Sequence, residues 1–200
     1  MDRISLKPAL LARRVSYEIA PTYVAQYAKD GTENWRTDFG DLTSLNFVLH
    51  TIGGNRMRRL DLVTNEGRKS IALNLGIRVG RDDPDRVAIR QVHSAVADAV
   101  YAARPDIQVA LGEQGAARIA MFVVGVMTLL FGIGMCIAMF VTNVSMDRAV
   151  GVAVPIGLMV VLGGFFAHKY APWREAVTLS IQAFAVMMAA DAASPPVPSA

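Results

Sequence analysis

Five basic side chains of this 200-residue chain lie close enough in the sequence to act together on an anion. Near a bilayer, each such cation contributes about 1 kcal/mol of attraction to anionic headgroups. The sequence therefore offers a candidate lipid or partner contact, with a solvated sheet face as the alternative. Three of the residues share a predicted strand and two follow the next turn: Arg56, Arg58, Arg59, Arg68 and Lys69.

The three histidines, His50, His93 and His168, are far apart in the sequence, and no motif brings them together. His93 lies beside the apolar stripe of a predicted helix, so we expect a structural role for it. Catalysis needs a positioned nucleophile, base or metal, and none can be assembled from these residues.

Metal and cofactor motifs are equally weak. Asp82, Asp83 and Asp85 surround a predicted helix start, where acidic residues favourably meet the helix dipole, so capping explains them better than a cation site. The single cysteine, Cys136, cannot form a thiolate cluster, and no glycine-rich phosphate loop is present. We therefore expect no catalytic residues, no metal and no cofactor, and a protein that is not an enzyme.

Two long uncharged runs, Ile119–Val141 and Ala149–Ala167, dominate the second half of the chain. About 20 apolar residues are needed to cross a bilayer, so both runs predict transmembrane helices. The link between them is so short that the helices must form an antiparallel hairpin over residues 119–167. Both ends of the chain are then expected in one compartment.

Residues suited to a membrane interface flank the outer ends of this hairpin: Arg118, Lys169, Trp173 and Arg174. The excess of basic residues there predicts cytoplasmic N- and C-termini and a multi-pass protein of the inner (plasma) membrane. The helical spacing of apolar residues over 172–190 predicts an amphipathic helix lying in the headgroup region. We expect the proline-rich residues 191–200 to be disordered.

The first half of the chain has the alternation and the turn residues of an antiparallel sheet. We expect one helix to close this sheet, starting at Asp83-Pro84, with a soluble domain over 1–108 and a linker over 109–118. The predicted strands are Val15–Ile19, Tyr23–Ala28, Asn34–Asp38, Leu45–Thr51, Arg58–Thr64 and Lys69–Leu75.

This order of elements resembles that of bacterial membrane proteins with a pleckstrin-homology-like (PH-like) domain. The residues that carry the resemblance are Val15-Ser-Tyr-Glu-Ile, Phe39-Gly-Asp-Leu-Thr-Ser-Leu, the hairpin from Leu60 to Lys69 and the helix Asp85–Arg104. The resemblance implies an α+β fold, a small antiparallel sheet or barrel closed by one C-terminal helix. It implies no catalytic residue, because this family is largely uncharacterised.

Two functions fit these features. The first is a membrane-anchored interaction or scaffolding module with a protein partner, which predicts an exposed apolar patch or an unpaired strand edge. The second is a domain that binds anionic lipid headgroups. The net charge of +3 is too small for a nucleic-acid partner. Small residues in the apolar runs also allow homo- or hetero-oligomers through the transmembrane helices.

Overall fold

The computed structural model describes residues 3–76, 78–80, 82–112, 116–142, 146–173 and 177–194. The chain divides into two units, which we name by their content. The sheet unit consists of residues 1–112 and 176–200, and the helical unit consists of residues 113–175. The sheet unit is therefore built from both ends of the chain, with the helical unit inserted into it.

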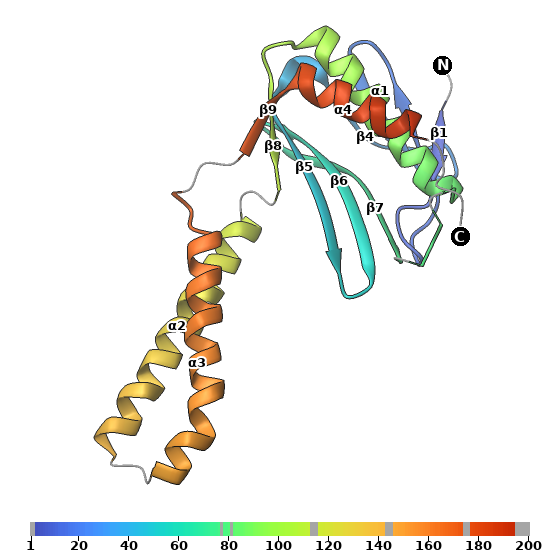
Figure 1. The fold of residues 1–200 in the computed structure, drawn as a ribbon. Helices are drawn as coiled ribbons and strands as arrows, with labels where there is room; N and C mark the ends of the chain where they lie inside the picture. The colour runs from blue at the N-terminus through green and yellow to red at the C-terminus, as the bar shows by residue number, and fades with distance from the viewer. Residues whose placement is uncertain are drawn as a thin grey trace. The chain divides into compact units, whose positions relative to one another are not determined.

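The sheet unit contains two sheets (Figure 1). The first is antiparallel, in the order β1-β2-β3-β4, and the 3-10 helix η1 (Phe39–Asp41) connects it to the second. The second has the order β7-β6-β5-β8-β9, in which only β5 and β8 run parallel. The strands are β1 Ile4–Leu6, β2 Val15–Ile19, β3 Tyr23–Tyr27, β4 Glu33–Asp38, β5 Leu42–Ile52, β6 Asn55–Thr64, β7 Gly67–Gly76, β8 Gln108–Leu111 and β9 Val177–Ser180.

A two-residue turn fixes the register of the long β5–β6 hairpin. Gly53 and Gly54 both have positive φ, +57° and +80°, which only glycine adopts at little cost. Ile52 consequently pairs with Asn55, and the ladder continues without interruption to Leu45 opposite Leu62.

Two helices cover the core of the sheet unit, α1 (Pro84–Ala103) and α4 (Ile181–Ala193), and they lie side by side (Figure 1). The carboxylate of Asp83 begins α1 by accepting hydrogen bonds from the backbone N–H groups of Asp85 and Arg86. The buried side chains of both helices join one apolar core with the sheets, including Ile89, Val92, Val96 and Val100 of α1 and Ile181, Phe184 and Met188 of α4.

The predicted strands and the predicted closing helix are confirmed within a few residues. The unit is nevertheless larger than residues 1–108, because β8 occupies part of the expected linker 109–118. Two helices, rather than one, close the core. The amphipathic helix expected over 172–190 in the headgroup region is corrected by the structure. Residues Val177–Ser180 form β9, and the helix α4 begins only at Ile181 and packs its buried side chains in the core of the sheet unit. The predicted tail 191–200 begins inside α4, and its residues 195–200 lie outside the described part of the chain.

The helical unit is an antiparallel pair, α2 (Ala116–Val141) and α3 (Met146–Lys169). Glycines set its close packing: a Cβ added at Gly125 would lie 2.5 Å from the backbone N of Ala167, and one added at Gly163 would lie 2.5 Å from that of Leu129. Gly134 and Gly157, which the small-residue pattern also suggests for packing, have no atom within 4 Å of such a Cβ. Gly132 is a further close point, 2.9 Å from the side chain of Val160 for such a Cβ, so the two helices meet through Gly125, Gly132 and Gly163.

Candidate functional site

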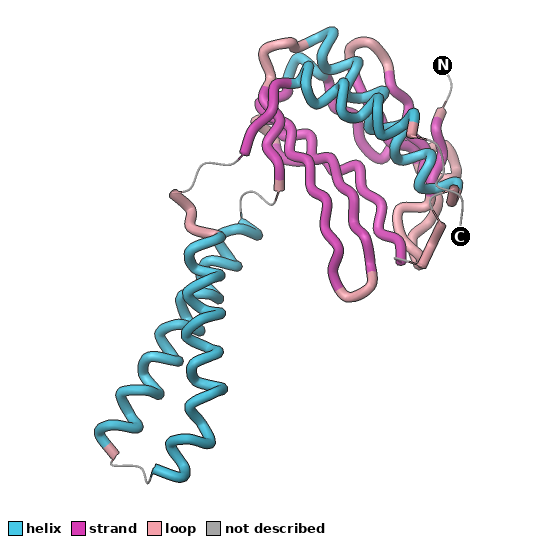
Figure 2. The backbone as a smooth tube through the Cα atoms, in the orientation of Figure 1, coloured by secondary structure: helices cyan, strands magenta, loops and turns pink. Residues whose placement is uncertain are grey.

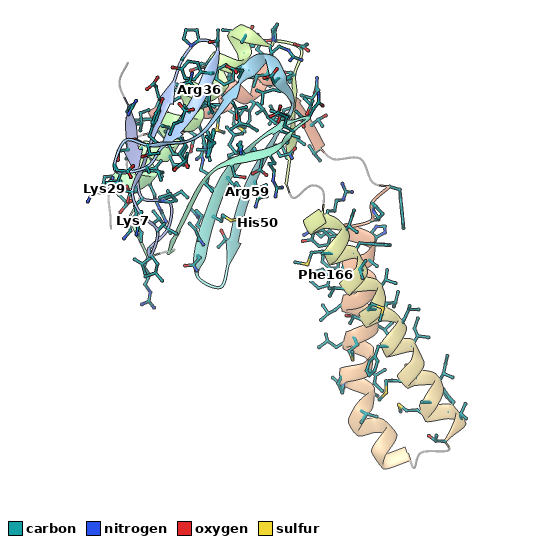
Figure 3. All side chains as sticks on the ribbon, turned by 180° about the vertical axis from the view of Figure 1, so that it is seen from behind. Lys7, Lys29, Arg36, His50, Arg59 and Phe166 are labelled. Atoms are coloured by element: carbon teal, nitrogen blue, oxygen red, sulfur yellow. The ribbon has the colours of Figure 1, made fainter. Side chains whose placement is uncertain are left out.

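The five basic residues singled out in the sequence do not share one surface. Successive residues of a strand point to opposite faces, and residues paired across strands share a face. Arg58 pairs with Leu73 and lies on the face of buried Leu60, whereas Arg59 pairs with Ala72 and lies on the opposite face. Figure 3 labels Arg59 on β6, beside His50 on the neighbouring strand β5. The structure therefore divides the predicted cluster in two.

Arg59 and Arg68 surround a buried carboxylate, that of Asp61, whose side chain is only 1% exposed. The Nε of Arg59 lies 3.0 Å and the Nη1 of Arg68 lies 3.6 Å from its oxygens, and the Ser70 hydroxyl donates a hydrogen bond of 2.6 Å. A carboxylate removed from water needs such partners. These two arginines thus stabilise the β6–β7 pair.

Arg58 points towards the two helices. Its Nε donates a hydrogen bond of 3.0 Å to Nδ1 of His93, its Nη1 contacts the carboxylate of Asp191, and its Nη2 lies 3.0 Å from the sulfur of Met188. The guanidinium also lies 5.2 Å from the centre of the Phe47 ring. Burial lowers the pKa of Arg58, and Asp191 opposes this effect. Arg58 therefore links β6 to α1 and α4.

His93 supports Arg58 through hydrogen bonds at both of its ring nitrogens. It is fully buried, and burial, with a smaller effect from Arg58, lowers its pKa from 6.5 to about 3. The ring is consequently neutral, and its Nε2, 3.2 Å from the carbonyl oxygen of Ile71, carries the hydrogen while Nδ1 accepts from Arg58. His93 has the structural role expected from its place beside the apolar stripe of α1.

Arginines from β6 and α1 line a cavity of about 210 Å³ in the sheet unit. Sequence reasoning singled out Arg56 and Arg58 but missed Arg86, Arg90 and Asp191. The i,i+4 spacing of Arg86 and Arg90, which puts both on one face of α1, was the available signal. The cavity is lined by Leu49, Arg56, Arg58, Arg86, Arg90, Asp191 and Ser194.

A larger cavity of about 690 Å³ lies at the turn between β6 and β7, and the remaining residues of the predicted cluster, Arg68 and Lys69, line it. Arg36 adds a third cation, but Asp38, Asp41 and Glu66 also line the cavity. Three basic and three acidic groups leave it without net charge, so it has no preference for an anion.

The predicted interface residues gather at the end of the helical unit where α2 begins and α3 ends. Arg118 donates a hydrogen bond of 2.8 Å to the carbonyl oxygen of Ala171, and the exposed ring of Trp173 packs edge-on against Phe122, 5.4 Å between centres. Lys169 lies 5.7 Å from the ring centre of Tyr170. Figure 3 labels Phe166, one turn before Tyr170, whose ring it stacks against. Arg174 lies outside the described residues.

Both helices of this unit contain segments long and apolar enough to cross a membrane, Arg118–Val141 and Gly151–Lys169. Only 11% of each apolar window is buried in the structure. The core helix of a soluble protein is mostly buried, whereas these two windows are mostly exposed within the structure.

No model of a known protein family matches this chain, and a search of curated proteins finds no match either. Within the described residues, no three histidine, cysteine, aspartate or glutamate side chains gather as a metal site would require.

Proposed function

We propose that the chain is a membrane-anchored, non-catalytic interaction module, in which the helical unit spans the membrane as a hairpin and the sheet unit binds a protein partner. The observation that carries the proposal is the place of the insertion. The helical unit is inserted between β8 and β9, and the strand ends at its two junctions, Leu111 and Val177, are paired neighbours. An insertion between two paired strand ends leaves the pairing of β8 with β9 intact, so the sheet unit keeps its fold while carrying the helical unit.

The exposed apolar surfaces of α2 and α3, and the Arg118, Lys169 and Trp173 group at their outer end, support the membrane anchor. We propose that the end where α2 begins and α3 ends lies on the cytoplasmic side of the inner membrane. Both chain termini are proposed to lie on the same side. The sheet unit is proposed to be PH-like, because a four-stranded sheet, three further antiparallel strands and the helix α1 follow one another in that order.

A strand edge on β5 supports the protein-binding part of the proposal. Among the strands that the structure describes, β8 pairs with β5 only from Leu45 to Phe47, while β6 runs on beside β5 to their shared turn (Figure 2). The carbonyl of Phe47 accepts a hydrogen bond from Gly112 on the β8 side, so the N–H and C=O groups of Leu49 and Thr51 face the same edge. An extended segment of a partner protein can add there as a strand.

Site-specific labelling tests the anchor. In a Cys136→Ala background, single cysteines are introduced as Leu11→Cys, Ser194→Cys and Ser145→Cys, and a membrane-impermeant maleimide is applied to sealed vesicles of each orientation. Positions 11 and 194 are expected to react from one side and position 145 from the other. Reaction of all three from the same side would refute the hairpin.

Backbone blocking tests the strand edge. Leu49→Pro deletes an N–H that faces the open edge, whereas Val48→Pro deletes one that belongs to the β5–β6 ladder. A photo-crosslinking residue at Thr51 in membranes is expected to give one discrete protein adduct, which Leu49→Pro removes without changing the thermal midpoint. The same residue placed at Leu11 is the control for random contact. An adduct that survives Leu49→Pro, or that also forms from Leu11, argues against strand addition.

Headgroup binding through Arg56, Arg58, Arg59, Arg68 and Lys69 is not the function we propose. These five residues do not form one surface: Arg59 and Arg68 surround Asp61, whereas Arg58 lies on the opposite face of the strand pair.

A further inference from the structure

The cavity between β6, α1 and the end of α4 concentrates positive charge. Its lining includes four arginines and one carboxylate, that of Asp191, so arginines outnumber carboxylates among the lining residues. Arginine side chains stay protonated at any physiological pH, and each presents a planar set of N–H donors suited to oxyanions. Like charges this close together repel one another, and the carboxylate of Asp191 offsets part of this repulsion by contacting Arg58.

The central arginine of the cavity is fixed in place before any ligand arrives. Contacts with His93, Asp191 and Met188 hold three nitrogens of Arg58, whose side chain is 14% exposed. On α1, Arg86 donates to the carbonyl oxygen of Gly76. A preorganised donor loses little freedom when it binds, which favours specific recognition over a diffuse charge effect.

Asp191 occupies the position of a bound anion. Its carboxylate contacts Arg58, and the Nη1 of Arg90 lies 3.4 Å from its backbone carbonyl oxygen. Its side chain is 39% exposed, and it lies in the last turn of α4, two residues before the helix ends at Ala193. A carboxylate carries one charge, whereas a phosphate monoester carries up to two and offers three oxygens. A phosphate group can therefore replace Asp191 at these guanidinium groups.

The size of the cavity limits the ligand. About 210 Å³ corresponds to about seven waters at ~30 Å³ each, which is below the 300 Å³ or more of a typical drug-sized site. Phosphate or a phosphate monoester head fits this space, and the remainder of a larger ligand would lie outside it. The larger cavity at the β6–β7 turn has no net charge and does not compete for such an anion.

We propose that Arg56, Arg58, Arg86 and Arg90 form a binding site for a small phosphate-class anion, with Asp191 as the internal carboxylate that the ligand displaces. The site lies entirely within the sheet unit, so it exists whether or not the helical unit spans a membrane or a protein partner binds the β5 edge.

Isothermal titration of the full chain in nanodiscs of zwitterionic lipid tests the site, with inorganic phosphate as the probe and chloride at matched ionic strength as the blank. Saturable phosphate binding is expected. Arg56→Ala and Arg90→Ala should each weaken it about tenfold or more, the loss of one charge-assisted contact. Asp191→Asn should strengthen it about threefold or more, because it removes the competing charge but keeps the shape.

Arg36→Ala is the matched control, since it removes a half-exposed arginine from the other cavity and should leave phosphate affinity unchanged. The opposite sign expected for Asp191→Asn separates ligand competition from simple damage to the fold, and the thermal midpoint of each variant is recorded alongside. No saturable heat with either the native chain or Asp191→Asn would overturn the proposal. Equal affinities for the native chain and an Arg56→Ala, Arg90→Ala double variant would also overturn it.

Two further arms identify the source of the phosphate group. Glycerol 3-phosphate represents a soluble monoester, and nanodiscs with one tenth phosphatidic acid represent a lipid headgroup. If a lipid occupies the cavity, phosphatidic acid should suppress the heat of the phosphate titration of the native chain. The Arg90→Ala variant should then give the same titration in discs with phosphatidic acid as in zwitterionic discs. If the ligand is soluble, the titration should be the same in both discs and glycerol 3-phosphate should compete with phosphate.

Discussion

The Nε of Arg58 donates a hydrogen bond of 3.0 Å to Nδ1 of His93, which is completely buried. A cation and a neutral imidazole thus form the polar centre of an otherwise apolar junction between β6 and α1. Burial of the ring, and to a smaller extent the positive charge of Arg58, disfavours protonation of His93 and lowers its pKa to about 3.

The lowered pKa of His93 predicts that the free energy of unfolding decreases in acid. The unfolded chain protonates His93 near pH 6.5, whereas the folded protein does not until about pH 3. Stability contributed by the neutral ring is therefore complete above pH 6.5 and falls as the pH is lowered towards 3, by at most about 1.4 kcal/mol per pH unit. His93→Gln should flatten this slope, because its amide can still accept from Arg58 without titrating.

Urea unfolding of the two proteins at a series of pH values measures the effect, with Trp35 fluorescence as the signal in a Trp173→Phe background. Carboxylates that titrate in the same window contribute equally to both proteins and cancel in the difference. Parallel stability curves from pH 7 to pH 4 would show that His93 is not responsible.

The buried carboxylate of Asp61 should matter far more than an exposed one. Asp61→Ala leaves the charge of Arg59 beside an apolar site and the Ser70 hydroxyl without its acceptor, so we expect a loss of about 3 to 5 kcal/mol in the free energy of unfolding. Asp106→Ala, at an ion pair with Arg104 whose acidic side chain is 66% exposed, should have no measurable effect. Similar urea midpoints for both variants would contradict the structural role of Asp61.

The insertion of the helical unit predicts which shortened chains fold. Residues 1–108 lack β8, β9 and α4 and should aggregate, because the core surface covered by Phe184 and Met188 becomes exposed. Joining Gly112 to Val177 through a short glycine-rich loop should instead give a soluble protein, since Leu111 and Val177 are already paired across two antiparallel strands.

Size-exclusion chromatography and the cooperativity of thermal unfolding distinguish the two shortened chains. Adding Phe184→Ala to the joined chain should cost about 3 to 5 kcal/mol, the usual loss for a buried aromatic side chain. If residues 1–108 alone unfold as cooperatively as the joined chain, α4 is not part of the core.

Hairpin packing is tested at the glycines. Gly163→Leu places a side chain against the backbone of Leu129 and should separate α2 from α3. Gly164→Leu is the matched control, because a Cβ there meets no atom within 4 Å. The two variants are compared by the SDS fraction needed to unfold the helical pair, and equal values would refute the close approach at Gly163.

Local patterns predicted most of the sheet unit because its strands are sequential hairpins. Turns such as Gly53-Gly54 and alternating residues such as Leu45, Phe47 and Leu49 act over short distances, so the sequence contains the necessary information. The capped start of α1 at Asp83-Pro84 is equally local. The strand bounds were consequently predicted to within a few residues.

The elements that the sequence did not predict depend on distant partners. β8 and β9 are four residues each and pair across the whole helical unit, so no local signal distinguishes them from linkers. The spacing of Ile181, Phe184 and Met188 was recognised, but an apolar stripe has the same period whether it faces lipid or a protein core. The arginine cavity was missed for the same reason, since it joins Arg58 to Arg90 and Asp191.

The position of the helical unit within the sheet unit also sets an order of events during synthesis. The ribosome makes the chain from its N-terminus, at about 5 to 20 residues per second, so β9 and α4 emerge roughly 4 to 16 s after β8. During that interval both apolar helices are made while the core still lacks Phe184 and Met188. The sheet unit can therefore complete its core only after the helical unit has been made, which leaves a period in which the incompletely folded chain is open to proteolysis.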